Sequence, residues 1–460
     1  MSKAFVFPTS LLQSIAKFCT IDESKLVEAH NQTASTSIRI NAFKQTQKFD
    51  SQQKVSWANQ AHYLNERIEF IKDPLFHAGA YYVQEASSMF LEQAIKHSVD
   101  LTTELKVLDL CASPGGKSTL INSLLNEKSF LVSNEVIKTR VGALCENLSK
   151  WGQANVVVCN NDAQDFAALP DYFDLIVVDA PCSGSGLFRK QEDAIDHWSE
   201  ENVEHCAARQ KRILADIYSS LKPNGILIYS TCSYSTQENE EIVSWLMEEK
   251  NMESIQITLD SNWNITETNT SKGGYGYRFF PHLTNGEGFF LAALKKEDIE
   301  SEQTQQHYKR NKDSKTKQNK DELIALSKFI IENENNEIIQ LKENYFLISK
   351  AIIAELDKLG VLYLRKKGTL LGEFKGKDFI PHHELALSNY VNKDFSSVEV
   401  NTDEALQYLK KSELRLTNDI ERGFCLVKFE EHPIGWAKNI GNRFNNYLPK
   451  DWRILKDIDN

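Results

Sequence analysis

The sequence predicts an α/β protein built around a doubly wound, mostly parallel sheet. Between residues 76 and 296, strand-like and helix-like segments alternate, and this alternation is typical of a parallel sheet covered by helices. A glycine-rich turn, CASPGGKST, joins the first of these strands to the first helix. Outside this unit we expect a small α+β segment at 1–75, a charged linker at 297–321, and one or two small α+β domains at 322–460.

Five segments of the central unit have the continuous apolar character of strands that are buried on both faces. They are 106–112, 130–135, 155–162, 173–181 and 226–233. One helix is expected to close at Gly152, and a longer one to end at Pro223 and Gly225. Ligands of such sheets bind at the carboxyl ends of the strands, so we expect the functional site there.

The N-terminal segment carries two further patterns. Residues 10–18 have apolar side chains at helical spacing, with Ser10 as the expected N-cap. Residues 37–43 alternate as a strand does.

Composition narrows the class of protein. The 460 residues are 41% hydrophobic, which is enough for packed cores. No apolar run is long enough to span a membrane and no signal peptide begins the chain, so we expect a cytoplasmic protein. The 8 cysteines should be reduced there, and none has zinc-ligand spacing, so no metal is expected. The net charge of −11 argues against a general nucleic-acid coat but allows a local basic groove.

The glycine turn ends in GKS, as a phosphate-binding loop does. Such a loop needs a glycine five residues before Gly116, and this chain has Cys111 there. Pro114 stiffens the turn further. A P-loop NTPase nevertheless stays an alternative, because LIVVDAP resembles the strand that holds magnesium in those enzymes. The dinucleotide pattern G-x-G-x-x-G is absent from the turn.

Four acidic residues lie at the ends of the predicted strands: Asp109, Glu135, Asp162 and Asp179. Glu135 follows Gly116 by about 20 residues, the spacing at which a carboxylate meets a ribose diol. This set suits a cationic, adenosine-bearing ligand such as S-adenosylmethionine better than a polyphosphate. The alternative is that each acid only caps the next helix.

Two cysteines follow neighbouring strands in serine- and glycine-rich turns, Cys182 in DAPCSGSG and Cys232 in STCSYS. A single cysteine is more often a small buried hydrophobe, but two beside Asp179 indicate thiol chemistry. Carbon 5 of a pyrimidine becomes nucleophilic when a thiolate adds to carbon 6. An acid at the ring nitrogen stabilises the adduct, and a second thiol can assist its release.

These motifs together resemble those of a known family. LDLCASPGGKST, NE, ND, VVDAPCSGSG and IYSTCSYSTQENE are similar to the successive motifs of the Nol/Nop/Sun family of RNA cytosine-5 methyltransferases. The flanking stretches 81–89 and 277–294 also resemble that family, so the likeness spans about 80–295. It implies a Rossmann-like methyltransferase domain that uses S-adenosylmethionine.

The resemblance also implies roles for single residues. Cys232 would be the nucleophile, Cys182 would help to release the product, and Asp179 would serve both cofactor and cytosine. The expected cofactor site consists of Cys111, Ala112, Ser113, Pro114, Gly115, Gly116, Lys117, Glu135, Asp162 and Asp179.

Three residues are candidates for positioning RNA. Lys190 resembles a basic residue near the target base, and Arg278 and His282 lie in a flanking motif. Alternatively, His282 is a structural loop histidine and Arg278 a surface charge. We expect Lys117 to orient its loop.

The two ends of the chain indicate which class of substrate the protein acts on. FPTSLLQSIAKF and SIRINAFK resemble the family's N-terminal RNA-positioning segment. Residues 423–454 resemble the C-terminal region of bacterial rRNA methyltransferase F proteins, which implies a PUA-like RNA-binding region. We therefore expect an RNA cytosine-5 methyltransferase that acts on 16S rRNA or the small ribosomal subunit, without membrane or DNA partners. Arg, Lys and aromatic residues are interleaved in this tail, which suits contact with the RNA backbone and stacking on bases. Alternatively, the tail is a small β-domain whose aromatics are core residues. A catalytically idle RNA-binding assembly factor is the alternative function.

Overall fold

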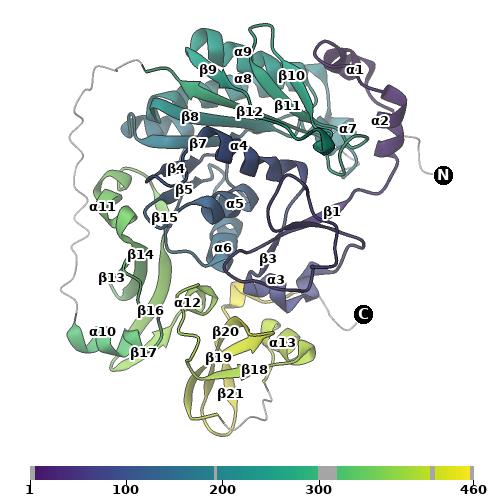
Figure 1. Cartoon of the computed structure of the whole chain (residues 1–460). Coiled ribbons are helices and arrows are strands. Elements are labelled where there is room, and N and C mark those ends of the chain that lie inside the picture. Colours follow the sequence, from purple (N-terminus) through teal and green to yellow (C-terminus); the bar gives the residue numbers. More distant parts are fainter. Residues whose placement is uncertain (1–5, 191–193, 299–318, 415–419, 456–460) are drawn as a thin grey trace.

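A ten-stranded mixed sheet forms the centre of the molecule (Figure 1). The computed structural model describes residues 6–190, 194–298, 319–414 and 420–455. Five parallel strands lie in the order β8, β7, β4, β5, β6. Their bounds are Leu221–Thr231, Phe173–Asp179, Lys106–Asp109, Phe130–Asn134 and Val156–Cys159. The predicted doubly wound sheet is confirmed, and the strand order reverses between β4 and β7.

Antiparallel strands complete both edges of this sheet. Beyond β8 lie β12 (Phe289–Lys296), β11 (Tyr275–Phe279) and β10 (Thr266–Asn269), and β9 (Met252–Ile255) also pairs with β12. At the other edge, β15 (Leu364–Lys367) pairs with β6. The region after residue 321 therefore contributes a strand to the central sheet, which the sequence pattern does not reveal.

Helices bury both faces of the sheet, because successive strand residues point to opposite sides. Val107 packs among α4 (Leu91–Ser98), α5 (Gly116–Leu124) and α6 (Val141–Trp151). Leu108 packs on the opposite side among α8 (Glu200–Ile217), α9 (Glu240–Glu249) and α11 (Lys350–Leu359). A short α7 (Ala194–His197) precedes α8. Within the described ranges, no helix has the length and apolar character that crossing a membrane requires.

Two predicted helix ends differ from the structure, and one agrees. α6 closes at Gly152, which adopts the left-handed conformation with a φ of 89°. α8 ends at Ile217, because the chain turns extended at Leu221 and Pro223 lies inside β8. α1 (Thr9–Ala16) follows Pro8 without a side-chain cap, so Ser10 is not its N-cap.

The N-terminal region forms a three-stranded antiparallel sheet. β1 (Thr36–Ile40) lies between β2 (Ala61–Leu64) and β3 (Tyr81–Val83), with α2 (Glu23–His30) and α3 (Pro74–Ala78) in the same region. Because β3 lies after residue 75, the expected boundary at 75 falls inside this region.

The side chain of Lys44 links three parts of the chain. Its buried Nζ donates to the carbonyls of Ala78 at 2.8 Å, Lys150 at 2.5 Å and Leu387 at 2.6 Å. A buried carbonyl that has no hydrogen-bond donor is costly, so these three bonds favour this arrangement of the chain. Helices α3, α6 and α12 (His383–Leu387) are therefore joined at one side-chain nitrogen.

The C-terminal region consists of two small α+β units. The first has the strand order β13, β14, β16, β17, and the second β18, β19, β20, β21. The strands span Asn336–Leu341, Asn344–Ser349, Thr369–Lys375, Asp378–Pro381, Ser397–Glu399, Gly423–Phe429, His432–Asn439 and Phe444–Asn446. The helices are α10 (Lys320–Ser327), α12 (His383–Leu387) and α13 (Thr402–Leu409). Most of the expected linker, 299–318, lies outside the described residues.

Of the tail aromatics, Trp436 is a core residue. It is 0% exposed, and its Nε1 donates to the carbonyl of His382 at 3.0 Å. Phe444, Tyr447 and Trp452 are half-buried.

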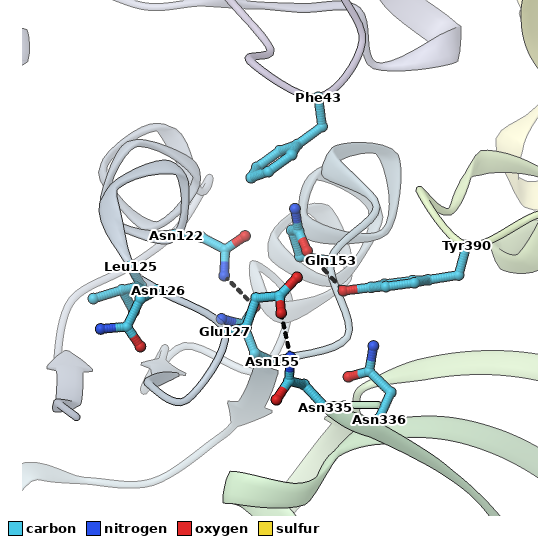
Figure 2. A pocket seen from close by; sticks show the side chains of 10 residues that line it. All are labelled: Phe43, Asn122, Leu125, Asn126, Glu127, Gln153, Asn155, Asn335, Asn336 and Tyr390. Carbon is cyan, nitrogen blue, oxygen red and sulfur yellow. Dashed lines mark hydrogen bonds between the residues drawn. The ribbon is translucent and has the colours of Figure 1, made fainter. Parts of the chain in front are cut away.

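Carboxamides join the first C-terminal unit to the central domain (Figure 2). The hydroxyl of Tyr390 donates to Gln153 Oε1 at 3.0 Å, and Asn335 Nδ2 donates to Glu127. These side chains surround a small polar cavity that Phe43 also lines. The central domain thus has polar, hydrogen-bonded contacts to the C-terminal region in addition to β15.

Asp109 places a carboxyl group in the interior, at the end of β4. It is 0% exposed, its Oδ2 accepts a hydrogen bond from Ser118 Oγ at 2.6 Å, and its Oδ1 has no partner among the described residues. Burial raises the pKa of Asp109 to about 7, although Ser118 and Lys117 oppose this shift.

Replacing this carboxyl group should change how stability depends on pH. Between about pH 4 and about pH 7, the folded protein holds a proton on Asp109 that the unfolded chain has lost. The contribution of the protonated Asp109 to the free energy of unfolding is therefore full below about pH 4 and disappears as the pH rises through about 7. We expect Asp109→Asn to gain stability relative to the parent protein between about pH 5 and about pH 8. Urea unfolding of the cofactor-free protein measures this difference. Asp50→Asn, at an exposed position, is the control, and parallel profiles for Asp109→Asn and the parent protein would contradict the assignment.

Candidate active site

The two predicted cysteines meet at the carboxyl ends of neighbouring strands. Cys182 follows β7 and Cys232 follows β8, and their Sγ atoms are 3.0 Å apart. Both side chains are half-buried. The hydrogen bond to Cys232 and burial raise the pKa of Cys182 well above its ordinary value. Cys182 is therefore a protonated thiol beside Cys232.

The loops that carry the cysteines are hydrogen-bonded to each other. The amide of Gly186 donates to the carbonyl of Cys232 at 2.9 Å, and the amide of Tyr234 donates to Ser185 Oγ at 2.8 Å. A Cβ at Gly186 would lie 2.4 Å from the carbonyl oxygen of Gly288. The glycine and the serines of DAPCSGSG thus allow the two loops to approach this closely.

A buried carboxylate that the sequence analysis missed lies between these loops. Glu238 is 0% exposed and accepts hydrogen bonds from Ser183 and Ser233, the residues that follow the two cysteines. The signal was present in the sequence as the ENE that ends IYSTCSYSTQENE. Without the structure, an acidic residue in a polar stretch cannot be distinguished from an ordinary surface charge.

Asp179 lies at the end of β7, beside the cysteine pair. Its Oδ2 forms an ion pair with Lys117 Nζ at 2.7 Å, and its Oδ1 accepts from Ser230 Oγ at 2.8 Å. Burial alone would lower the pKa of Lys117, but the charge of Asp179 and its hydrogen bond raise it. The lysine expected to orient its own loop thus also holds the Asp179 side chain.

The glycine turn forms a backbone cradle at the start of α5. Gly115 has a φ of 117°, in the left-handed region that glycine favours. The carbonyl of Ser113 accepts from Arg140 Nη2 at 2.7 Å, and the carbonyl of Pro114 accepts from Asn147 Nδ2 at 2.9 Å. Burial raises the pKa of Cys111, so this side chain is a neutral thiol. Cys111 and Ala112 complete the turn between β4 and α5.

The remaining strand-end acids differ in role. Glu135 is 3% exposed and accepts from the amide of Ile137 at 2.8 Å. Asp162 caps the 3-10 helix η3 (Ala163–Ala168) in a capping box with Asp165. The capping alternative therefore describes Asp162. The buried, partnerless Oδ1 of Asp109 and the carboxylate of Glu135 beside the glycine cradle fit a cationic adenosine ligand such as S-adenosylmethionine.

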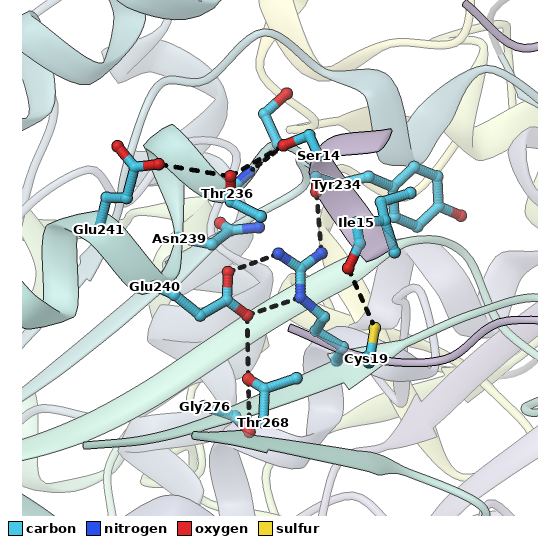
Figure 3. Close-up of polar contacts among 12 residues, drawn as sticks. Ser14, Ile15, Cys19, Tyr234, Thr236, Asn239, Glu240, Glu241, Thr268 and Gly276 are labelled. Carbon is cyan, nitrogen blue, oxygen red and sulfur yellow. Dashed lines mark hydrogen bonds and ion pairs between the residues drawn. The ribbon is translucent and has the colours of Figure 1, made fainter. Parts of the chain in front are cut away.

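Arg278 requires a correction. Its side chain is 1% exposed, and its guanidinium donates to Glu240 Oε1 at 2.7 Å and to Glu240 Oε2 at 2.5 Å. It also donates to the carbonyl of Tyr234 at 2.8 Å. Figure 3 shows the surrounding Glu240, Tyr234 and Thr268. Arg278 is thus neither a surface charge nor placed to contact a phosphate; it holds the backbone just after the second cysteine.

The other two candidates for RNA positioning lie nearer the surface. Lys190 is exposed at the end of the Cys182 loop. His282 packs beside Phe280, with ring centroids 5.8 Å apart, and burial lowers its pKa. Its Nδ1 is buried and has no hydrogen-bond partner in the described part of the chain.

Comparison with known families divides the chain into three matched regions. Residues 97–295 match 16S rRNA methyltransferase RsmB/F. Residues 7–86 match the N-terminal domain of 16S rRNA methyltransferase RsmF, and residues 395–454 match the methyltransferase RsmF PUA domain.

Individual relatives agree with these matches. The chain is 31% identical over 380 residues to ribosomal RNA small subunit methyltransferase F of Erwinia tasmaniensis, which covers 81% of this chain and 78% of the relative. The protein of the same name from Pectobacterium atrosepticum is 30% identical and covers 86% of this chain and 81% of the relative.

Solved structures share the fold. A methyltransferase homologue from Pyrococcus horikoshii superposes with a TM-score of 0.54 and 25% identity, over 63% of this chain and 95% of that one. NSun6 from the same organism, solved with SFG, has a TM-score of 0.52 and 19% identity, over 63% and 98%. From the matched domains and the full-length relatives, the chain belongs to the RsmB/F family of 16S rRNA methyltransferases and is of the RsmF type.

Proposed function

We propose that this protein methylates carbon 5 of a cytosine in 16S rRNA, through a covalent adduct between Cys232 and carbon 6. The observation that carries the proposal is the pair of thiols 3.0 Å apart, beside Asp179 and the glycine cradle. Methylation of an amine needs no thiol, whereas methylation of a pyrimidine carbon uses one as nucleophile. S-adenosylmethionine supplies the methyl group, and the cradle at 111–117 with Glu135 would hold it.

The reaction begins when the Cys232 thiolate forms a bond to carbon 6 of a cytosine that has been turned out of its helix. The electrons of the carbon 5–carbon 6 double bond move to carbon 5, which then accepts the methyl group. Asp179, in hydrogen-bonding reach of the same space, holds a proton at the ring nitrogen and stabilises the adduct. Its ion pair with Lys117 keeps this carboxyl group at the end of β7.

Cys182 completes the cycle. After methyl transfer, carbon 5 must lose its proton to a water molecule, and the carbon 6–sulfur bond must break so that the ring double bond re-forms and Cys232 leaves as a thiolate. The raised pKa of Cys182 keeps this thiol protonated beside Cys232. It is placed to donate a hydrogen bond to the departing Cys232 thiolate, which suits the releasing residue rather than the nucleophile.

The substrate contacts are assigned to the parts outside the central sheet. The β18–β21 unit overlaps the matched PUA region, and the β1–β3 sheet lies in the matched N-terminal region. Lys190 is exposed next to the Cys182 loop and would contact the RNA near the target. The substrate is 16S rRNA or the small subunit that contains it, so the protein would work in the cytoplasm. An NTPase is not favoured, because the lysine of GKS is paired with Asp179.

Replacing the two cysteines should give different defects. We expect Cys232→Ala to abolish transfer of labelled methyl groups from S-adenosylmethionine to 16S rRNA, because no adduct can form. We expect Cys182→Ala to accumulate an RNA–protein adduct that survives denaturation, because the adduct forms but is not released. Denaturing gels and scintillation counting measure both.

Cys206→Ala, at a buried cysteine on α8, is the matched control and should behave as the parent protein. Unchanged turnover in Cys232→Ala, or the absence of any adduct in Cys182→Ala, would contradict the roles assigned to the two thiols.

Asp179 and Lys190 should affect different kinetic constants. We expect Asp179→Asn to lower kcat by on the order of 10²-fold, because the amide cannot hold the proton at the ring nitrogen. Lys190→Ala should raise KM for RNA, leave kcat nearly unchanged and weaken the salt dependence of binding. Steady-state kinetics at several salt concentrations separate the two. An Asp179→Asn variant with the kcat of the parent protein would remove Asp179 from the reaction.

A further inference from the structure

We propose that Glu238 is a positioning residue that fixes the Cys182 loop against the Cys232 loop and thereby controls release of the methylated product. The proposal rests on the two-cysteine function described above. Glu238 itself lies behind both loops, fully buried, so it acts on the reaction through its neighbours.

The first loop is held at the residue directly after Cys182. The backbone amide of Ser183 donates to Glu238 Oε1 at 2.8 Å, and the hydroxyl of Ser183 donates to Glu238 Oε2 at 2.5 Å. One carboxylate therefore accepts both donors of a single loop residue, which fixes the position and the orientation of that backbone.

The second loop is held at the corresponding position. The hydroxyl of Ser233, directly after Cys232, donates to Glu238 Oε2 at 2.5 Å. Gln210, which comes from α8, donates through Nε2 to Glu238 Oε1 at 3.2 Å and to the carbonyl of Pro181 at 3.1 Å. The residues on both sides of Cys182 are thus connected to the same carboxylate.

The donors around Glu238 favour a carboxylate as their acceptor. Four hydrogen bonds from these groups point at Glu238, and no ion pair reaches it in the described ranges. Burial raises the pKa of Glu238, and the donors from Ser183, Ser233 and Gln210 oppose this shift. A carboxylate accepts all four of these hydrogen bonds, whereas an amide would turn its own N–H groups toward two of the donors, and the Ser183 and Ser233 hydroxyls would have to turn and accept them.

The two loops do not depend on Glu238 equally. The Cys232 loop has a second support in Asn239, whose Nδ2 donates to the carbonyl of Ser233 at 2.7 Å and whose Oδ1 accepts from Thr231 Oγ1 at 2.6 Å. The Cys182 loop is bonded to the Cys232 loop farther along, at Ser185 and Gly186, but directly beside Cys182 both donors of Ser183 are on Glu238. Loss of the carboxylate should therefore displace Cys182 more than Cys232, so that release suffers more than adduct formation.

The test compares Glu238→Gln with the parent protein and with Cys182→Ala in the same assay. The readouts are the fraction of RNA in a denaturation-resistant adduct, single-turnover methyl transfer, cofactor binding and the melting temperature. A displacement of about 1 Å in a reacting group can reduce turnover by on the order of 10²-fold. We expect Glu238→Gln to accumulate adduct as Cys182→Ala does, with turnover reduced to that extent and cofactor binding retained.

Glu249→Gln, at an exposed position at the far end of α9, is the matched control and should behave as the parent protein. Glu238→Asp keeps the charge but withdraws the carboxylate, and should accumulate less adduct than Glu238→Gln. If Glu238→Gln melts below the assay temperature, Glu238→Asp is judged against the parent protein by the same adduct criterion.

The outcomes separate this proposal from the function on which it rests. If Cys182→Ala traps adduct but the Glu238 variants show the parent ratio of adduct to product, the positioning role is overturned. The positioning role is also overturned if adduct formation and methyl transfer both fall in proportion to the fraction of protein that binds cofactor. Such a loss marks a purely structural residue. If Cys182→Ala itself traps nothing, the proposed function fails first.

Discussion

The parallel pairing of β7 with β8 places the two thiols, and the rest of the site depends on its register. Asp179 lies opposite Ser230, and Cys182 and Cys232 follow these residues within one short turn. A slip of one residue would turn every side chain of a strand to the opposite face of the sheet. Both faces are packed with apolar side chains from different helices, so such a slip would disrupt both cores. The packing of the core thus fixes the register, and the register brings the Sγ atoms of Cys182 and Cys232 together.

Buried polar groups then set the details of the site. Asp109, Glu238 and the Arg278–Glu240 pair all lie under the strand ends, with little or no exposure. A buried polar group is costly unless it is hydrogen-bonded, so each of these groups favours the backbone arrangement that provides its partners. Arg278 binds the carbonyl of Tyr234, and Glu238 binds the residues after both cysteines. The reactive thiols are held by neighbours that do not touch the substrate.

Local patterns in the sequence predicted the central sheet and most of the site, because strand ends in a parallel sheet meet at one edge. The glycine turn, Asp179 and both cysteines come together for this reason. Contacts between distant segments could not be predicted in this way. β15 joins β6 from some two hundred residues away, Glu240 partners Arg278 across the sheet edge, and Glu238 resembled any polar residue. Arg278, on β11, was misassigned because a charge in a flanking motif gives no sign of a buried partner.

This chain places a methyl group on carbon 5 of cytosine in 16S rRNA. Bisulfite sequencing of 16S rRNA from cells with and without the gene tests this activity most directly, because 5-methylcytosine resists the conversion that cytosine undergoes. We expect a cytosine that resists conversion in the parent cells, converts fully in the deletion strain, and is not restored to resistance by Cys232→Ala. Identical conversion at every cytosine of the 16S rRNA from both strains would contradict it.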